Sequence, residues 1–181
     1  MVEMKVVGLS LDESTKAPIL VLRREESDEL LPIWIGAMEA MAISLALNNV
    51  DVPRPLTHDL LLHTLHALRA ELVAVDLVDL REGTYFAELV LIAGGRQARV
   101  DCRPSDGIAL ALRAGVPILV REDVLRRAAE DRMRPMQDDS AVLRAPGDTT
   151  LGMTREQLAE PDEKELSDLL QSLDPETKYR M

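Results

Sequence analysis

The stretch that decides the fold is Glu71-Leu-Val-Ala-Val-Asp-Leu-Val-Asp-Leu-Arg-Glu-Gly-Thr-Tyr-Phe-Ala-Glu-Leu-Val-Leu-Ile-Ala-Gly-Gly-Arg-Gln-Ala-Arg-Val-Asp-Cys102. Glycine-containing turns at residues 81–83 and 93–95 divide it into three segments rich in aliphatic side chains. Apolar or alternating runs between turn residues are typical of strands. The stretch therefore predicts strands at 71–80, 84–93 and 96–102, joined by two short turns.

The residues before this stretch extend the same sheet. Apolar or alternating segments at 4–11, 17–24 and 30–35 alternate with polar turns and predict three more strands. A helix is expected over 37–47, and because it is apolar on nearly every side we expect it to be buried. A second helix is expected over 58–70, with Thr57 as its cap and with Leu61, Leu65 and Leu68 on its apolar face.

The residues after the stretch predict a short helix and a last strand. Arg103 or Ser105 would cap a helix over 105–114, which Gly115 would end, and 116–120 reads as a strand. The fold class is therefore α+β, with a mixed, largely antiparallel β-sheet packed with helices. The sequence adds a C-terminal helical appendage to this fold.

The predicted division of the chain is a domain over 1–125, a polar linker with short helices over 126–160, and an amphipathic C-terminal helix and tail over 161–181. In the last segment, Leu166, Leu169, Leu170 and Leu173 recur at helical spacing. That helix would dock on its own domain or, as the alternative, bind a partner.

Composition limits the classes of function. The net charge is −11, and the chain has one Trp, two Tyr and one Phe, which argues against a broad basic surface or aromatic platforms for nucleic acid. The single cysteine, Cys102, excludes an internal disulfide and a cysteine-based zinc site. No signal peptide or membrane-spanning apolar run is evident, so we expect a cytoplasmic protein.

Two polar corners, each at the expected start of a helix, carry the candidate chemistry. The first corner contains Arg54, Thr57, His58 and Asp59, and the second contains Asp101, Arg103, Ser105 and Asp106. Helix N-termini suit anionic ligands such as phosphate. The alternative is structural, with the hydroxyl and acidic residues capping the helices and each arginine pairing with an acid.

Three other features have a functional and a structural interpretation. Glu39, the only charged residue in the expected 37–47 helix, would either pair with Arg54 or Arg103 or face a cleft. His63 and His66 would form a metal pair with Asp59, but we favour a solvated surface for both. We expect Trp34 in the core or in an interface.

Several blocks of the sequence resemble the bifunctional nuclease (BFN) domain family, in family order over about residues 1–125. They are Leu31-Pro-Ile-Trp-Ile-Gly36, Glu39-Ala40, Pro53-Arg-Pro-Leu-Thr-His-Asp-Leu60, Gly83-Thr-Tyr-Phe-Ala87 and Arg103-Pro-Ser-Asp106. The chain departs from the family pattern at Asn48-Asn49, where a small residue or Gly is usual, and at Cys102 and Gly107, where Ala is common.

The resemblance implies an enzyme, a nuclease that hydrolyses phosphodiester bonds in RNA and DNA. In such a site Arg54 and Arg103 would hold the phosphate with Thr57 and Ser105, and His58 would be the general acid or base. Asp59, Asp106 and Glu39 would assist it, and Asp101 and Asp106 would share Mg²⁺ or Mn²⁺. This site requires the two corners to meet.

Two alternatives stay open. The first is a non-catalytic binding or regulatory module, which the acidic surface favours, and the second is a pocket for a small anionic ligand. The apolar 31–35 segment and the apolar 37–47 helix also predict a homo-oligomer.

Overall fold

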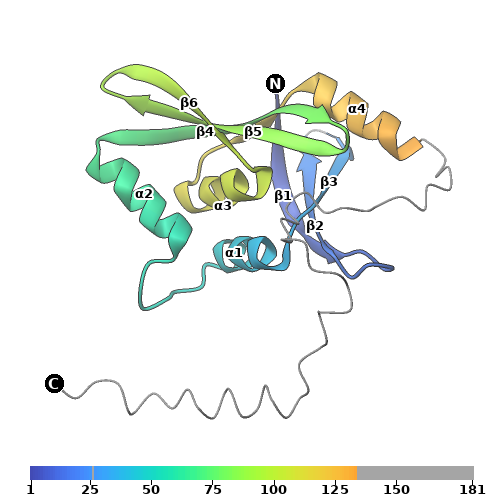
Figure 1. Ribbon diagram of the computed structural model, residues 1–181, viewed down its shortest axis with the longest axis horizontal. Coiled ribbons are helices and arrows are strands. Elements are labelled where there is room, and N and C mark those ends of the chain that lie inside the picture. The colour runs from blue at the N-terminus through green and yellow to red at the C-terminus, as the bar shows by residue number, and fades with distance from the viewer. Residues whose placement is uncertain (26, 134–181) are drawn as a thin grey trace, which may run out of the picture. The chain divides into compact units, whose positions relative to one another are not determined.

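The computed structural model describes residues 1–25 and 27–133, which all lie in the first of two compact units, residues 1–139. Within the described residues, seven strands form one mixed sheet and four helices accompany it (Figure 1). The predicted α+β class is confirmed.

The sheet has the strand order β3-β2-β1-β7-β4-β5-β6. Its strands are β1 (Val2–Leu11), β2 (Pro18–Arg24), β3 (Leu30–Trp34), β4 (Ala70–Arg81), β5 (Thr84–Ala93), β6 (Arg96–Cys102) and β7 (Ile118–Val120). The short strand β7 joins the two halves, because it pairs antiparallel with β1 and parallel with β4. All other neighbouring pairs are antiparallel.

The turns of the 71–102 stretch form where the glycines predict them. Gly83 has a φ of 75° in the β4–β5 turn, and Gly94 and Gly95 have φ values of 56° and 75° in the β5–β6 turn. Positive φ is accessible to glycine at little steric cost, so these residues set the ends of the hairpins.

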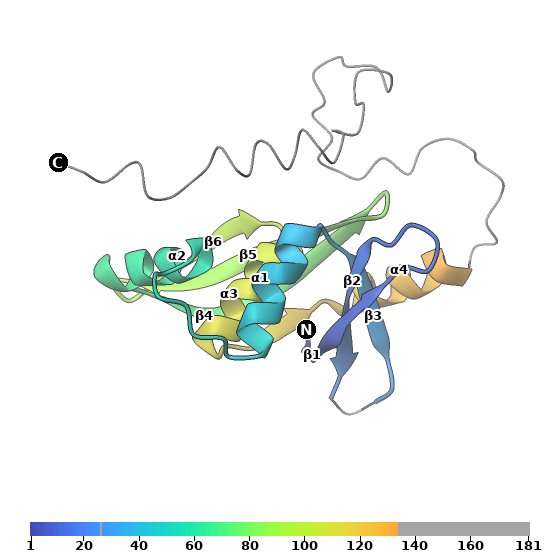
Figure 2. The same ribbon diagram turned by 90° about the horizontal axis from the view of Figure 1, so that it is seen from below.

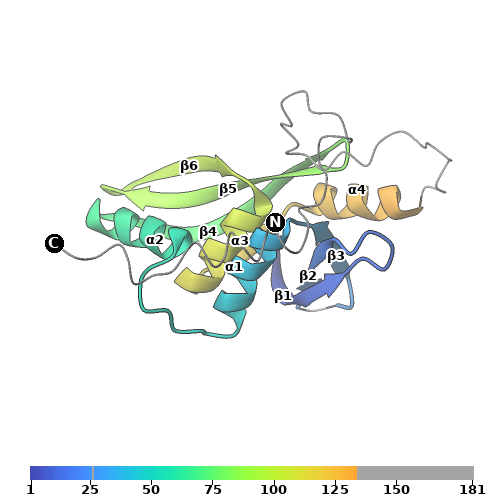
Figure 3. The same cartoon turned by 60° about the horizontal axis from the view of Figure 1, so that its bottom comes forward.

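Three helices gather on one side of the sheet (Figures 2 and 3). They are α1 (Ala37–Leu47), α2 (Thr57–Ala67) and α3 (Pro104–Ala114). Helix α3 is the central one, since it contacts α1, α2, β4 and β5. Six of its residues are buried, and Gly115 ends it with a left-handed φ of 67°, as predicted.

The structure corrects two expectations about helix burial. Helix α1 is not buried on all sides: Ile43 alone is buried within it, while Met38 and Met41 are 73% and 57% exposed. On α2 the buried face centres on Leu62 rather than on Leu61 and Leu68, which are exposed. In both helices the contact with α3 decides which face is covered.

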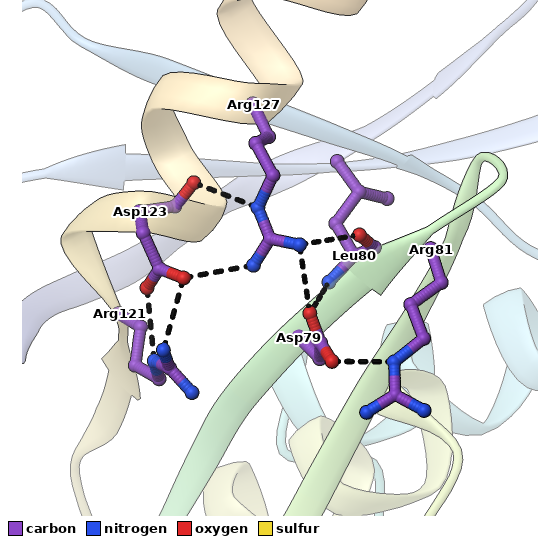
Figure 4. Close-up of polar contacts among 6 residues, drawn as sticks. All are labelled: Asp79, Leu80, Arg81, Arg121, Asp123 and Arg127. Atoms are coloured by element: carbon purple, nitrogen blue, oxygen red, sulfur yellow. Dashed lines mark hydrogen bonds and ion pairs between the residues drawn. The ribbon is translucent and has the colours of Figure 1, made fainter.

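The fourth helix, α4 (Glu122–Met133), is held against the end of β4 (Figure 4). Arg127 donates to the Leu80 carbonyl at 2.8 Å, and its guanidinium pairs with Asp79 at 2.9 Å and with Asp123 at 2.8 Å. Val124, Leu125 and Ala128 are buried in the common core, so the helix crosses the predicted boundary at residue 125. Residues 134–181, where most of the linker and the C-terminal helix were predicted, lie outside the described residues.

None of the helices that the structure describes has the length and apolarity to cross a membrane.

Candidate functional site

The two predicted corners meet through four side chains near the N-terminal ends of α1, α2 and α3. Arg103 pairs with Asp106 (Nε to Oδ2, 2.7 Å) and with Glu39 of α1 (Nη1 to Oε1, 2.8 Å). His58 of α2 reaches the same aspartate, with its Nε2 3.4 Å from Oδ1 of Asp106. We call Glu39, His58, Arg103 and Asp106 the polar cluster.

Helix α3 places Arg103 and Asp106 together. Arg103 is the residue before the helix, Pro104 begins it, and Asp106 lies in its first turn. Proline suits the first helical position, and an acid in the first turn is stabilised by the helix dipole. The spacing of three residues then brings the guanidinium over the carboxylate.

The charges of the polar cluster stabilise one another. Burial raises the pKa of Asp106, but the hydrogen bond and charge of Arg103, with a smaller contribution from His58, outweigh it, so the pKa lies below its usual value. The same contacts raise the pKa of Arg103, with Asp106 as the main cause and Glu39 as a further one. At neutral pH the cluster therefore contains two carboxylates and one guanidinium.

Arg103 keeps donors available to a ligand. A guanidinium carries five N–H groups, and the contacts with Asp106 and Glu39 engage three nitrogen atoms through three of them. The Arg103 side chain is 65% exposed, whereas that of His58 is only 16% exposed. The cluster thus presents two N–H groups to solvent above a half-enclosed imidazole.

Asp59 lies next to His58 in sequence but belongs to a separate contact. Its Oδ1 accepts from Nε of Arg113 at 2.8 Å, and its Oδ2 accepts from the Leu56 N–H at 2.8 Å. Arg113 also donates to the carbonyls of Ala109 and Ala42. Burial raises the pKa of Asp59, and the Leu56 and Arg113 hydrogen bonds lower it by more, so the net shift is downward.

Thr57 does not cap α2, and of the two caps predicted for α3 the structure has Arg103 rather than Ser105. Leu56 and Arg103 occupy the N-cap positions, and at neither of them does a side chain accept a hydrogen bond from a backbone N–H. Asp59 takes that role for α2 by accepting from Leu56, while Ser105 is buried as the second residue of α3. Because Pro55 and Pro104 fix the backbone nearby, neither helix depends on a hydroxyl cap.

Arg54 and Asp101 do not join the polar cluster. Arg54 is exposed in the connection between α1 and α2, and it has no ion pair among the residues described. Cys102 packs against the core beneath α3, with its Sγ 3.1 Å from where a Cβ of Gly107 would lie. Because side chains alternate along a strand, Asp101 points to the other face of the sheet.

This placement bears on the Mg²⁺ or Mn²⁺ that the sequence suggested. Asp101 and Asp106 lie on opposite sides of the sheet, and Asp106 is already engaged by Arg103 and His58. Over residues 1–25 and 27–133, no group of three acidic, histidine or cysteine side chains is arranged to hold a metal ion. The donor set at the cluster therefore does not fit a shared divalent cation.

Besides the contacts of Arg127, sequence reasoning missed an ion pair of α2 and a group of ion pairs on the sheet. The first is the pair of Arg113 with Asp59, which lie 54 residues apart in the chain. The only sign of this pair in the sequence is that Arg113 stands in an apolar run. The second is a cluster on the outer face of the sheet, where Arg99 contacts Asp76 at 2.8 Å and Glu88 at 2.9 Å. The register of β4 and β5 places Asp76 opposite Glu88. The alternation of side chains along each strand predicts this pairing only when the register of the hairpin is already known.

His63 and His66 are exposed, as expected. Both lie at a cavity of about 580 Å³ that also touches Asp59, Glu71 and Arg113. Trp34 is 55% exposed at the end of β3, so its predicted place in the core is wrong, whereas a place in an interface stays a prediction.

These observations define an α+β domain with a charged corner made by three helix N-termini. The chain belongs to the bifunctional nuclease domain family, whose model matches residues 20–132. It is 48% identical over 126 residues to an uncharacterized protein of Mycobacterium tuberculosis, a match that covers 70% of this chain and 75% of that protein.

The chain also resembles named plant proteins. It is 30% identical over 142 residues to "Bifunctional nuclease 2" of Oryza sativa subsp. japonica, covering 76% of this chain and 43% of the plant protein. It is 28% identical over 180 residues to "Bifunctional nuclease 1" of Arabidopsis thaliana, covering 93% and 54%. The chain thus spans about half the length of these plant relatives.

Proposed function

We propose that this chain is a nuclease that hydrolyses phosphodiester bonds in RNA and DNA, with the polar cluster as its active site. The observation that carries the proposal is the meeting of Glu39, His58, Arg103 and Asp106 from α1, α2 and the start of α3. Family membership supports the reaction class. These side chains include a cation for phosphate and a group that exchanges protons near neutral pH.

In this mechanism Arg103 binds the scissile phosphate. Its two remaining N–H groups would donate to two phosphate oxygens, while Glu39 and Asp106 hold the guanidinium. This arrangement fixes the arginine before the substrate arrives, which reduces the entropy lost on binding. Arg54, in the exposed connection, would contact a neighbouring phosphate.

His58 moves the proton. With Asp106 accepting from Nε2–H, the other ring nitrogen, Nδ1, is left to take a proton from water. The water oxygen then bonds to phosphorus, the bond to the leaving oxygen breaks, and the imidazolium returns the proton to that oxygen. Asp59 acts indirectly, by fixing the start of α2 through Leu56 and Arg113.

No step of this mechanism passes through a metal ion, because Asp101 and Asp106 do not converge. The net charge of the polar cluster instead determines how well it binds a phosphate. With neutral His58 the cluster carries one net negative charge, and with protonated His58 it is neutral. A phosphate should therefore bind more tightly when His58 is protonated than when it is neutral.

A second candidate function is a non-catalytic binding or regulatory module. It is favoured by the mutual pairing of the cluster, in which each charged group already has a partner within the domain. In that case the four side chains only hold three helices together.

Cleavage of labelled single- and double-stranded RNA and DNA by the purified full chain tests the proposal. The assay compares EDTA with Mg²⁺ or Mn²⁺, using the wild type, His58→Ala, Asp106→Asn and Asp101→Asn. The two aspartate variants make the same chemical change five residues apart on opposite faces of the sheet.

We expect His58→Ala and Asp106→Asn to lower the rate by roughly a hundredfold or more, with Asp101→Asn close to the wild type. EDTA should leave the rate unchanged. If cleavage instead depends on a metal ion and is lost in both aspartate variants, that result would support a cation shared by Asp101 and Asp106. If no substrate is cleaved under any condition, the proposed nuclease function is wrong and the binding module is favoured.

A further inference from the structure

A cavity lies directly beside the polar cluster, and the mechanism above does not use it. It has a volume of about 580 Å³ and is bordered by the end of α1, the connection that follows it, α2, the end of α3 and the start of β4. We call it the α2 pocket. Its volume is within the range of pockets that bind small molecules, about 300–1,000 Å³.

The wall of the α2 pocket combines aliphatic and polar side chains. Its apolar members are supplied by five segments of the chain and include Leu45, Val52, Leu62, Leu72, Leu112 and Val116. Leu62 and Leu72 belong to the hydrophobic core, so this part of the wall is fixed. A flat or rounded apolar body is therefore the first requirement for a ligand.

The partly buried charged groups of the wall, Asp59 and Arg113, already have hydrogen-bond partners within the domain. Both oxygens of Asp59 accept hydrogen bonds, from Arg113 and from the Leu56 N–H. Arg113 is 10% exposed and donates through its other two nitrogens to the carbonyls of Ala109 and Ala42. This pair shapes the wall and leaves the recognition of a ligand to other groups.

The other polar side chains of the lining are exposed, and their charged members are carboxylates. They are the carboxylates of Asp51 and Glu71, the imidazoles of His63 and His66, and the amide of Asn49. With neutral histidines the lining is negatively charged, so it disfavours a phosphate and favours a ligand that presents N–H donors.

We infer that the α2 pocket binds a nucleobase that carries an exocyclic amino group, such as adenine or cytosine, from the strand whose phosphate lies at Arg103. The ring faces meet the aliphatic wall, and the amino group donates to Glu71 or Asp51. Carboxylates pair with the amino group of cytosine in the same way in protein–DNA complexes. The inference rests on the proposed nuclease function and assigns it a base preference.

The position of the pocket suits a nucleotide a few positions further along the same strand. His58 belongs to the polar cluster, and the next residue, Asp59, borders the pocket. On α3, Asp106 of the cluster and Arg113 of the pocket are seven residues apart, roughly 10 Å along the helix. That corresponds to about three nucleotides at roughly 3.4 Å per nucleotide of a strand.

The test measures the binding of nucleosides, which lack phosphate and so report on the pocket without the cluster. Adenosine, cytidine, uridine and spermidine are titrated into the full chain and followed by NMR chemical shifts. The wild type is compared with Glu71→Gln and with Glu82→Gln, which makes the same change at an exposed position of the β4–β5 turn. Cleavage of poly(A), poly(C) and poly(U) is measured on the same variants.

We expect adenosine and cytidine to bind more tightly than uridine, and Glu71→Gln to weaken their binding by roughly three- to tenfold while Glu82→Gln does not. The preference for poly(A) and poly(C) should decrease in Glu71→Gln. If the protein cleaves nucleic acid but does not bind nucleosides, the pocket inference is wrong and the proposed nuclease function is not. The same holds if Glu71→Gln leaves the base preference unchanged. Binding of spermidine in place of nucleosides would reassign the pocket to organic cations. Nucleoside binding without cleavage under any condition would support the pocket and overturn the nuclease.

Discussion

Gly107 of α3 and Cys102 of β6 share one tightly packed position beneath the polar cluster. A Cβ added at Gly107 would lie 3.1 Å from the Cys102 Sγ and 2.7 Å from Cγ1 of Val75 on β4. These are two of the positions where the sequence departs from the family pattern of Ala. Cys102 is larger than Ala and Gly107 is smaller, so the two differences offset each other and α3 keeps its distance from the sheet.

Gly107→Ala should therefore destabilise the domain, although alanine is the better helix former. Alanine gains about 1 kcal/mol in helix propensity, whereas overpacking a core costs typically 1–3 kcal/mol. We expect a net loss of about 1 kcal/mol, measured as a lower midpoint in urea. In the Cys102→Ala background the same change should cost less, and an equal cost in both backgrounds would contradict the shared packing.

The Asp59–Arg113 pair should matter more for stability than the exposed ion pairs. Arg113 is 10% exposed, and its removal takes one donor from Asp59 and one from each of two carbonyls. Breaking a buried pair costs about 3–5 kcal/mol, and because Asp59 is 27% exposed, Arg113→Ala should lower the free energy of unfolding by less, about 2 kcal/mol. Arg96→Ala on exposed β6 is the matched control and should change it by less than about 0.5 kcal/mol. Similar losses in both variants would show that the pair has no special role.

The acidic side of the stability profile follows from the lowered pKa values of Asp59 and Asp106. In the unfolded chain an aspartate is protonated near pH 4, but in the folded domain these two stay charged to lower pH. The unfolded state thus binds more protons in this range, and stability should decline from about pH 5 downward through the native pKa values. Urea unfolding at pH 7, 5, 4 and 3 measures the decline, which should be shallower for Asp59→Asn. An unchanged slope would contradict the assignment.

The exposed methionines of α1 make the predicted homo-oligomer testable. Met38 and Met41 are 73% and 57% exposed on a helix whose outer side is apolar. We propose that this side contacts a second copy of the chain, and Met38→Glu with Met41→Glu should yield a monomer in light scattering. Leu68→Glu, at a 72% exposed position after α2, is the control and should keep the assembly. A wild type that is monomeric at every concentration would disprove the prediction.

The strands and the helix starts could be predicted from local pattern, for clear physical reasons. The glycines of the 81–83 and 93–95 turns restrict the chain to hairpins, and the prolines near residues 55 and 104 mark where α2 and α3 begin. Helix faces were harder, because an apolar helix such as α1 has no sequence asymmetry that distinguishes its covered side. Only contact with α3 decides that Ile43 is inside and Met38 outside.

For the candidate site, sequence identified the polar cluster but not its boundaries. Glu39, His58, Arg103 and Asp106 come together, whereas Arg54, Asp59 and Asp101 of the predicted site do not join them, and the pairing of Glu39 with Arg103 was one of the expected alternatives. The separation of Asp101 from Asp106 depends on the face of β6 from which Asp101 points, and the partner of Asp59 lies 54 residues away. Neither fact is encoded within a local segment.

The central position of β7 has a consequence for how the protein is made. Among the strands that the structure describes, this three-residue strand is the last to leave the ribosome, and it pairs with β1 of one half of the sheet and with β4 of the other. Until residue 120 has emerged, the nascent chain holds two separate half-sheets with unpaired edges. Such edges invite pairing with other chains, so a translational pause shortly before Ile118 would expose the protein to aggregation, and a few further residues would end that risk.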